Sequence, residues 1–163
     1  MTNSSWCAGS IAWRLGASDN EGGTMSVESN KQAAKRYYDE ALNEGVLDAL
    51  DEIAVPGFVE HYPFPGQRDG LAGLKDRVTM IRSGLAAHFT VDDVIAEGDK
   101  VVVVWTNEGS MVSEFLGMPA NGKHFKIPGI DVWRLQDGKL AEHWHVVDQL
   151  GHAQQIGLIP ANA

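Results

Sequence analysis

The chain has 163 residues, of which 44% are hydrophobic and 21% are charged, and its formal net charge at pH 7 is -9. This length predicts one domain with a substantial core, and the negative charge argues against nucleic acid or an anionic membrane surface as a partner. The only cysteine, Cys7, excludes an internal disulfide and a cysteine-rich metal site. Because no stretch approaches the roughly 18 apolar residues that a membrane-spanning helix requires, we expect no membrane partner and a cytoplasmic protein.

The first residues differ in composition from the rest of the chain. Residues 1–25 mix Ser, Gly and Asn with two tryptophans, and they lack the basic start and continuous apolar centre of a secretory signal. We therefore expect a poorly structured N-terminal extension over residues 1–25 and a single domain over residues 26–163.

The first half of that domain has the spacing of helices. Residues 26–54 place alanines, tyrosines and leucines at helical intervals, with a break at Asn43-Glu44-Gly45. Residues 58–62 alternate but are followed by prolines, which keeps them out of the centre of a sheet. Residues 71–85 are helical again, with one apolar face formed by Leu71, Leu74, Val78 and Ile81.

From His88 onward the hydrophobic period becomes that of strands. Alternating runs occupy residues 89–96, 100–111, 123–135 and 139–147, and the last two flank Asp137-Gly138, a strong hairpin-turn signal. A final helix is expected over residues 149–156. Helices followed by an antiparallel meander predict an α+β domain with the helices on one face of a curved sheet, an arrangement that leaves a cavity.

Several phrases between Asn30 and Pro160 occur in an order that resembles the SnoaL-like polyketide cyclases. They are Tyr38-Asp39-Glu40 with Asn43-Glu44-Gly45, Val59-Glu60-His61, Phe115-Leu116-Gly117-Met118-Pro119, Gly129-Ile130-Asp131-Val132-Trp133-Arg134, and Asp137-Gly138-Lys139-Leu140-Ala141-Glu142-His143-Trp144 followed by Asp148 and Gln155-Ile156-Gly157. The resemblance implies the cone-shaped α+β barrel of the nuclear transport factor 2-like superfamily, in which a mixed, mainly antiparallel sheet wraps around N-terminal helices.

The resemblance also implies an activity. Cyclases of this family close a ring by intramolecular aldol condensation without a metal or an organic cofactor, and an acidic residue serves as general acid and base. By position, Asp148 is the expected carboxylate, and His61 matches a histidine on the pocket wall. Many relatives carry a histidine before the Glu-Phe-Leu-Gly phrase, where this chain has Gly109-Ser110-Met111-Val112-Ser113.

The strand after the Asp-Gly turn carries several titratable groups. Residues two apart on a strand share a face, so Glu142, Trp144 and Asp148 point one way and His143 and His145 the other, unless a bulge intervenes. The resemblance favours the first face as the pocket wall. We therefore expect the catalytic residues Asp148, His61 and Glu142 in a pocket formed with Trp144, Trp105, Tyr38 and Asp131.

Plainer interpretations of these residues stay open. Asp148 precedes the last helix and is suited to cap it, and Glu142 could pair with Arg134 across the hairpin. Tyr38 could orient a substrate oxygen or simply pack in the core. A zinc ion held by both histidines and Glu142 is disfavoured because strand parity separates the acid from the imidazoles.

Two functional classes compete. The leading hypothesis is a cofactor-independent enzyme, a cyclase or isomerase, that acts on a small hydrophobic oxygenated molecule. The alternatives are a non-catalytic binding or dimerisation module, or an epoxide hydrolase, for which Arg134 between Asp131 and Asp148 is a loose match. A homodimer packed sheet to sheet is expected, through an outer face thought to carry Val101, Val103 and Trp133.

Overall fold

In the computed structural model, residues 26–161 can be described, and the expected extension over residues 1–25 lies outside this range. The domain begins with α1 (Val27–Arg36), whose N-cap Ser26 accepts a hydrogen bond from the N–H of Ser29. This helix widens without a break into the π-helix η1 (Tyr37–Glu44). The short α2 (Ala49–Ile53) follows, and α3 (Gly70–Gly84) comes after the first strand.

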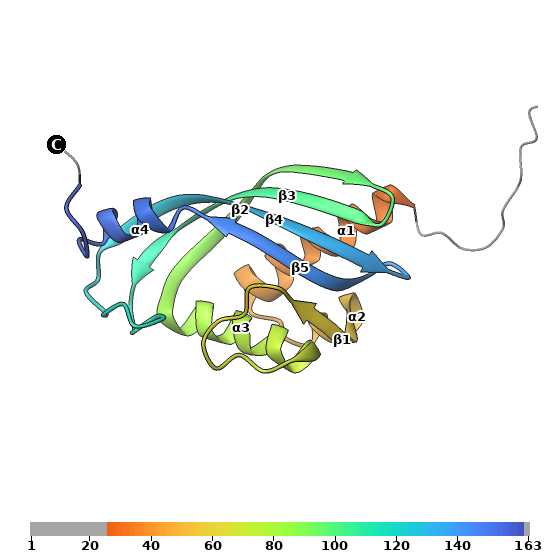
Figure 1. Cartoon of the computed structure of the whole chain (residues 1–163), viewed down its shortest axis with the longest axis horizontal. Helices are drawn as coiled ribbons and strands as arrows, with labels where there is room; N and C mark the ends of the chain where they lie inside the picture. Colours follow the sequence, from red (N-terminus) through yellow and green to blue (C-terminus); the bar gives the residue numbers. More distant parts are fainter. Residues whose placement is uncertain (1–25, 162–163) are drawn as a thin grey trace, which may run out of the picture.

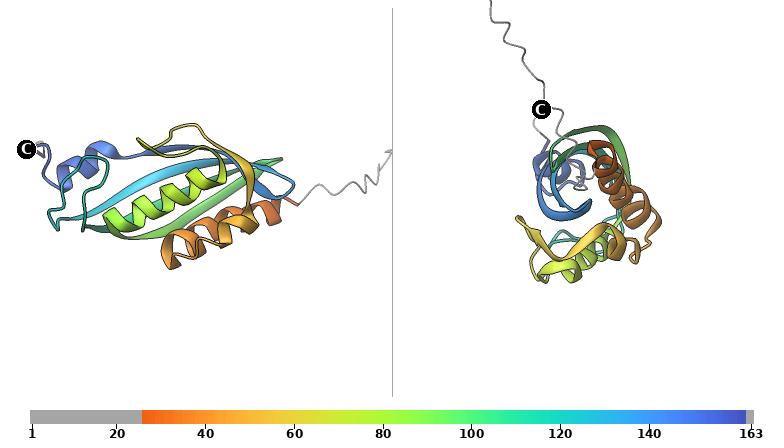
Figure 2. Two further views of the ribbon diagram at one scale, coloured as in Figure 1. Left: turned by 90° about the horizontal axis from the view of Figure 1, so that it is seen from below. Right: turned by 90° about the vertical axis from the view of Figure 1, so that its right-hand side faces the viewer.

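Five strands form one sheet, in the order β1-β5-β4-β3-β2. Their bounds are β1 (Ala54–Glu60), β2 (Leu85–Glu97), β3 (Lys100–Met111), β4 (His124–Gln136) and β5 (Lys139–Val147). The edge strand β1 runs parallel to β5, and the other pairs are antiparallel. The sheet curls around α1 and α3, as the end-on view shows (Figure 2). The predicted α+β class with a curved, mixed sheet is confirmed.

The predicted Asp-Gly hairpin is present between β4 and β5. Asp137 and Gly138 both have positive φ, 51° and 74°, as the favoured two-residue hairpin turn requires. Directly after the turn the pairing slips, because Arg134 lies opposite Glu142 whereas Leu135 lies opposite Leu140. The extra residue in β5 is a β-bulge, and it reverses the direction of every side chain beyond it.

The inner face of the sheet carries the core. Val101, Val103 and Trp133 are fully buried on that face, so the prediction that they form the outer surface was wrong. The outer positions of these strands alternate with the inner ones, and on β4 they include Ile130, which lies three residues before Trp133 and is 45% exposed. The last helix, α4 (Gln149–Gln155), lies at the end of the molecule away from the start of α1 (Figure 1). Among residues 26–161, no helix has both the length and the apolar character needed to cross a bilayer.

A homodimer stays a prediction, now placed on a different set of residues. Ile130 and Val146, which are 45% and 73% exposed, lie directly opposite each other on the outer face of β4 and β5. Burying such residues against a second copy would remove apolar surface from water. Light scattering at micromolar concentration should give a dimer mass, and the double variant Ile130→Glu with Val146→Glu should give a monomer.

The matched control for this variant is Val46→Glu, which places a charge on an exposed apolar residue that lies outside the sheet. It should leave the mass unchanged. A wild-type monomer, or a double variant that remains dimeric, would contradict the expected interface.

Candidate functional site

A cavity lies on the concave side of the sheet, between its inner face, α3 and η1. Its wall is largely aromatic and aliphatic, with Phe64, Phe89, Trp105 and Phe115 among the lining residues. Leu116 from the loop before β4, together with residues of α4, borders it at the end of the molecule where α4 lies (Figure 1). The charged, amide and imidazole side chains that line it are Arg77, Asn107, Asp131, His145, Gln149 and His152.

Asp131 on β4 is the buried carboxylate of this cavity, with 5% of its surface exposed. One of its oxygens accepts a hydrogen bond from the Tyr38 hydroxyl at 2.5 Å, and Trp133 Nε1 donates to that hydroxyl at 3.3 Å. The other oxygen lies 3.4 Å from His143 Nε2. Helix η1, through Tyr38, and strand β5, through His143, therefore hold the Asp131 carboxylate.

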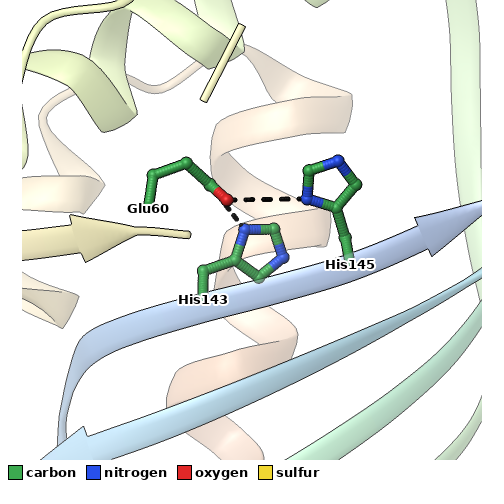
Figure 3. A group of neighbouring side chains, drawn as sticks. All are labelled: Glu60, His143 and His145. Atoms are coloured by element: carbon green, nitrogen blue, oxygen red, sulfur yellow. Dashed lines mark hydrogen bonds and ion pairs between the residues drawn. The ribbon is translucent and has the colours of Figure 1, made fainter. Parts of the chain in front are cut away.

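His143 links Asp131 to a second buried acid, Glu60. His143 Nδ1 donates to Glu60 Oε2 at 2.7 Å, and the two side chains are 1% and 5% exposed. The other oxygen of Glu60 lies 3.5 Å from His145 Nδ1. Figure 3 shows Glu60 reaching from β1 toward both imidazoles, which project from β5. The His143 ring also stacks on Trp133, with centroids 3.9 Å apart, an arrangement that favours a cationic imidazole.

Arg77 of α3 completes the charged group from the helical side. Its side chain is 6% exposed, and Nη1 lies 3.6 Å from Glu60 Oε2. Nη2 lies 3.4 Å from both ring nitrogens of His145, so the guanidinium sits over the imidazole. Its carbon lies 4.0 Å from the centre of the Phe64 ring. The guanidinium is thus fixed at the same end of the cavity as Asp131.

The mutual contacts decide the charges of these groups. Burial raises the pKa of Asp131, but the positive charge of His143 and the hydrogen bond from Tyr38 outweigh it and lower that pKa. Burial likewise opposes ionisation of Glu60, yet its two histidine partners and Arg77 lower its pKa. Burial lowers the pKa of His143, and the carboxylates of Asp131 and Glu60 more than reverse this. Two carboxylates therefore face two cations in a network that is close to neutral.

The β5 bulge explains which face of that strand meets the cavity. Leu140 is fully buried, and simple alternation from it would turn Glu142 and Trp144 inward. The slip after Leu140 instead turns His143 and His145 inward. Bulges commonly re-aim side chains next to functional sites. The prediction that the Glu142 face lines the pocket was wrong for this reason.

Glu60, His143 and His145 could be considered as a metal site, because their ligand atoms lie within 4.8 Å of one another. Zinc and iron accept such a donor set. Here Arg77 already supplies positive charge beside Glu60 and His145, and Asp131 stabilises the proton on His143. A bound metal would require a neutral His143. We therefore interpret the group as an ion-pair network, and the absence of a metal cofactor stays a prediction.

Asp148 lies outside the cavity. It is exposed, and its carboxylate accepts a hydrogen bond from the Gly151 N–H at 2.8 Å as the N-cap of α4. These contacts are those of a helix N-cap, which was the plainer of the two interpretations of Asp148.

His61, Glu142 and Trp144 do meet, but away from the cavity. Glu142 pairs with Arg134 at 2.6 Å and with His61 at 2.8 Å, and His61 stacks on Trp144 with centroids 4.1 Å apart. Hydrogen bonds from His61 and Arg134 lower the pKa of Glu142, whereas a general base needs a raised one. The predicted convergence of these residues with Asp148 on one pocket was wrong.

Of the expected pocket residues, Trp105 and Asp131 line the cavity, and Tyr38 lies behind Asp131. Sequence reasoning missed Glu60 and Arg77, although each carried a signal. Glu60 is two residues from the buried Phe58 and so shares its face. Arg77 falls in the apolar stripe of α3, where a charged residue requires a buried partner.

The capping role of Asp148 gives a direct test. Asp148→Ala should lower the free energy of unfolding by about 1 kcal/mol because the Gly151 N–H loses its acceptor, whereas Asp148→Asn retains a capping oxygen and should cost much less. Urea denaturation of both variants measures this difference. Equal losses in the two variants would show that the carboxylate charge, and not the cap, is what matters.

The charged network predicts a pH dependence of stability. Glu60 and Asp131 have lowered pKa values, so their contribution is present above the ordinary values of 4.5 and 3.8 and is lost as the pH falls through the lowered ones. His143 has a raised pKa, so its contribution is complete below 6.5 and is lost as the pH rises through the raised value. His143→Gln should therefore cost about 3–5 kcal/mol between pH 5 and 6 and progressively less at alkaline pH.

The measurement is the difference in unfolding free energy between wild type and His143→Gln across pH 5 to 9. Burial lowers the pKa of His152, so the contribution of His152 to stability rises with pH, opposite to that of His143. Because His152 is present in both proteins, its contribution cancels in the difference. A difference that does not change with pH would show that His143 is neutral in the folded state.

Comparisons with known proteins identify the family and the fold of the chain. A family model described as SnoaL-like polyketide cyclase matches residues 32–156. The aklanonic acid methyl ester cyclases DauD of Streptomyces sp. (strain C5) and DnrD of Streptomyces peucetius are each 29% identical over 125 residues. The 125 aligned residues cover 72% of this chain, 76% of DauD and 84% of DnrD. The structure of TsrD from Streptomyces laurentii superposes with a TM-score of 0.76 and 31% identity, over 83% of this chain and 99% of TsrD.

These matches agree with the resemblance seen in the sequence and confirm the nuclear transport factor 2-like fold. The family model covers most of the described domain, from α1 through α4. The chain belongs to the SnoaL-like polyketide cyclase family.

Proposed function

We propose that the protein is a cofactor-independent enzyme that closes a ring in a hydrophobic, oxygenated small molecule, with Asp131 as the proton-transfer group. The observation that carries this proposal is a buried, ionised carboxylate in an aromatic cavity, with Arg77 and His145 at the same end. The relatives DauD and DnrD are aklanonic acid methyl ester cyclases. A related polycyclic polyketide ester is therefore the first substrate class to consider.

The proposed step is an intramolecular aldol reaction. Asp131 accepts a proton from a carbon next to a carbonyl, and the electron pair of the C–H bond becomes an enolate. The enolate carbon forms a bond to a second carbonyl carbon of the same molecule, and the resulting alkoxide takes the proton back from Asp131. No atom is gained or lost and there is no net oxidation or reduction, so the step requires no oxidant or reductant.

The lowered pKa of Asp131 limits how this step can work. The carboxylate is ionised throughout the neutral range, but it is a weak base. The substrate C–H must therefore be made more acidic. A positive charge beside the enolate oxygen does this, because it stabilises the negative charge that develops there. Arg77 and His145 line the same end of the cavity, and Arg77 Nη1, although 3.6 Å from Glu60 Oε2, forms no hydrogen bond within the described residues. We assign them this stabilising role.

The alternative of an epoxide hydrolase has little support. Arg134, on which that hypothesis depended, is paired with Glu142 on the outer face of the sheet. Burying Glu60, Asp131 and Arg77 beside a cavity carries a desolvation cost that a purely structural module could avoid with apolar residues. Buried titratable groups with shifted pKa values cluster at functional sites. This cost and these shifted pKa values favour an enzyme over a scaffold.

The test is Asp131→Asn, assayed with aklanonic acid methyl ester as the probe substrate. The variant keeps the size of the side chain and removes the base, so kcat should fall by about 10²-fold or more while binding of the probe is largely retained. Asp148→Asn, which changes a carboxylate outside the cavity, is the matched control and should keep the wild-type kcat.

Circular dichroism must show that Asp131→Asn is folded, because Asp131 also partners His143. Tyr38→Phe supplies a second variant, since it removes a hydrogen bond to Asp131 but leaves the carboxylate in place. Turnover of Asp131→Asn at the wild-type rate would rule out Asp131 as the proton-transfer group.

A further inference from the structure

We propose that Asn107 and His152 bind a substrate oxygen at the end of the cavity remote from Asp131. This inference rests on the proposed function, because it assigns a second polar binding point to the substrate of the same cavity. Neither residue takes part in the proposed proton transfer. Both are specificity-determining residues.

Asn107 and His152 are buried polar side chains with atoms that have no partner. They line the cavity with 4% and 3% of their surface exposed. Asn107 Oδ1 and His152 Nε2 form no hydrogen bond within the protein. Buried polar atoms are nearly always satisfied, so two unsatisfied ones on a single cavity wall indicate a ligand with polar atoms at that place.

The pairing of the strands sets the distance between the two polar ends. Asn107 on β3 lies opposite Ile127 on β4, and Asp131 is four residues further along β4 on the same inner face. At the usual rise along a strand, this separation is about 14 Å. His152 packs edge to face against Phe125, at a centroid distance of 4.5 Å and two residues before Ile127. Asn107 and His152 therefore lie toward the α4 end of the cavity.

The wall between the two ends is flat and aromatic. Trp105 lies opposite Gly129, and a Cβ at position 129 would overlap the six-membered ring of its indole. Only glycine allows the indole to lie directly against β4. Phe89 packs on Trp105 with ring centroids 5.2 Å apart. A planar ring system can stack in such a space.

The chemistry at the α4 end suits a neutral oxygen. Burial lowers the pKa of His152, so the imidazole is neutral at pH 7. A neutral imidazole beside an asparagine amide can donate to a carbonyl and accept from a hydroxyl. At the other end, Arg77 and His145 suit an oxygen that develops negative charge.

The test uses two probes that share three fused rings. 2,6-Dihydroxyanthraquinone has a hydroxyl at each end, and 2-hydroxyanthraquinone has only one. Calorimetry should show that wild type binds the dihydroxy compound about tenfold more tightly, the value of one buried hydrogen bond. In the double variant Asn107→Leu with His152→Phe, this preference should disappear while the affinity for 2-hydroxyanthraquinone stays within about twofold.

Equal binding of the two probes by wild type would overturn the inference, even if the double variant failed to fold. A preference that survives in the double variant, or a loss of affinity that is the same for both probes, would overturn it too. Asp148→Asn serves as the control and should keep the wild-type preference. A failure of the proposed catalytic role would appear separately, as wild-type turnover in Asp131→Asn with the probe preference intact.

Discussion

The charged contacts around His143 are the constraint on which the rest of the site depends. His143 is 1% exposed and lies between Glu60 at 2.7 Å and Asp131 at 3.4 Å. Neither acid could remain ionised there alone, because burial opposes the charge of each. The imidazolium resolves this conflict, with Arg77 as a second cation from α3. Strands β1, β4 and β5 and helix α3 must therefore meet correctly for the network to form.

Two local irregularities make this arrangement possible. The bulge after Leu140 turns His143 inward, where regular alternation would have placed Glu142. Gly129 lets Trp105 lie against β4 and leaves the middle of the cavity flat. Sheets that surround a site commonly use bulges and glycines to re-aim side chains and admit close contacts. The fold thus supplies a curved frame, and single residues determine what the cavity presents.

Much of the fold could be predicted from the sequence, and rather less of the site. Helical spacing, alternation and the Asp137-Gly138 turn are local signals, and they were confirmed. The face of β5 was predicted wrongly because a one-residue bulge leaves no local mark in the sequence, yet it reverses every side chain after it. Glu60 was passed over in favour of its neighbour His61. Alternation from Phe58 already placed Glu60 on the inner face, but the parallel pairing of β1 with β5 was needed to show that it faces His143.

The central claim is that His143 is an imidazolium held by two carboxylates. Nitrogen-15 NMR of the histidine ring measures this directly across a pH titration. Both ring nitrogens should remain protonated above pH 6.5, the ordinary pKa, and Glu60→Gln should lower the pKa, whereas Glu142→Gln on the outer face should not change it. A His143 ring that is neutral at pH 6.5, or one whose pKa is the same in Glu60→Gln, would contradict the account.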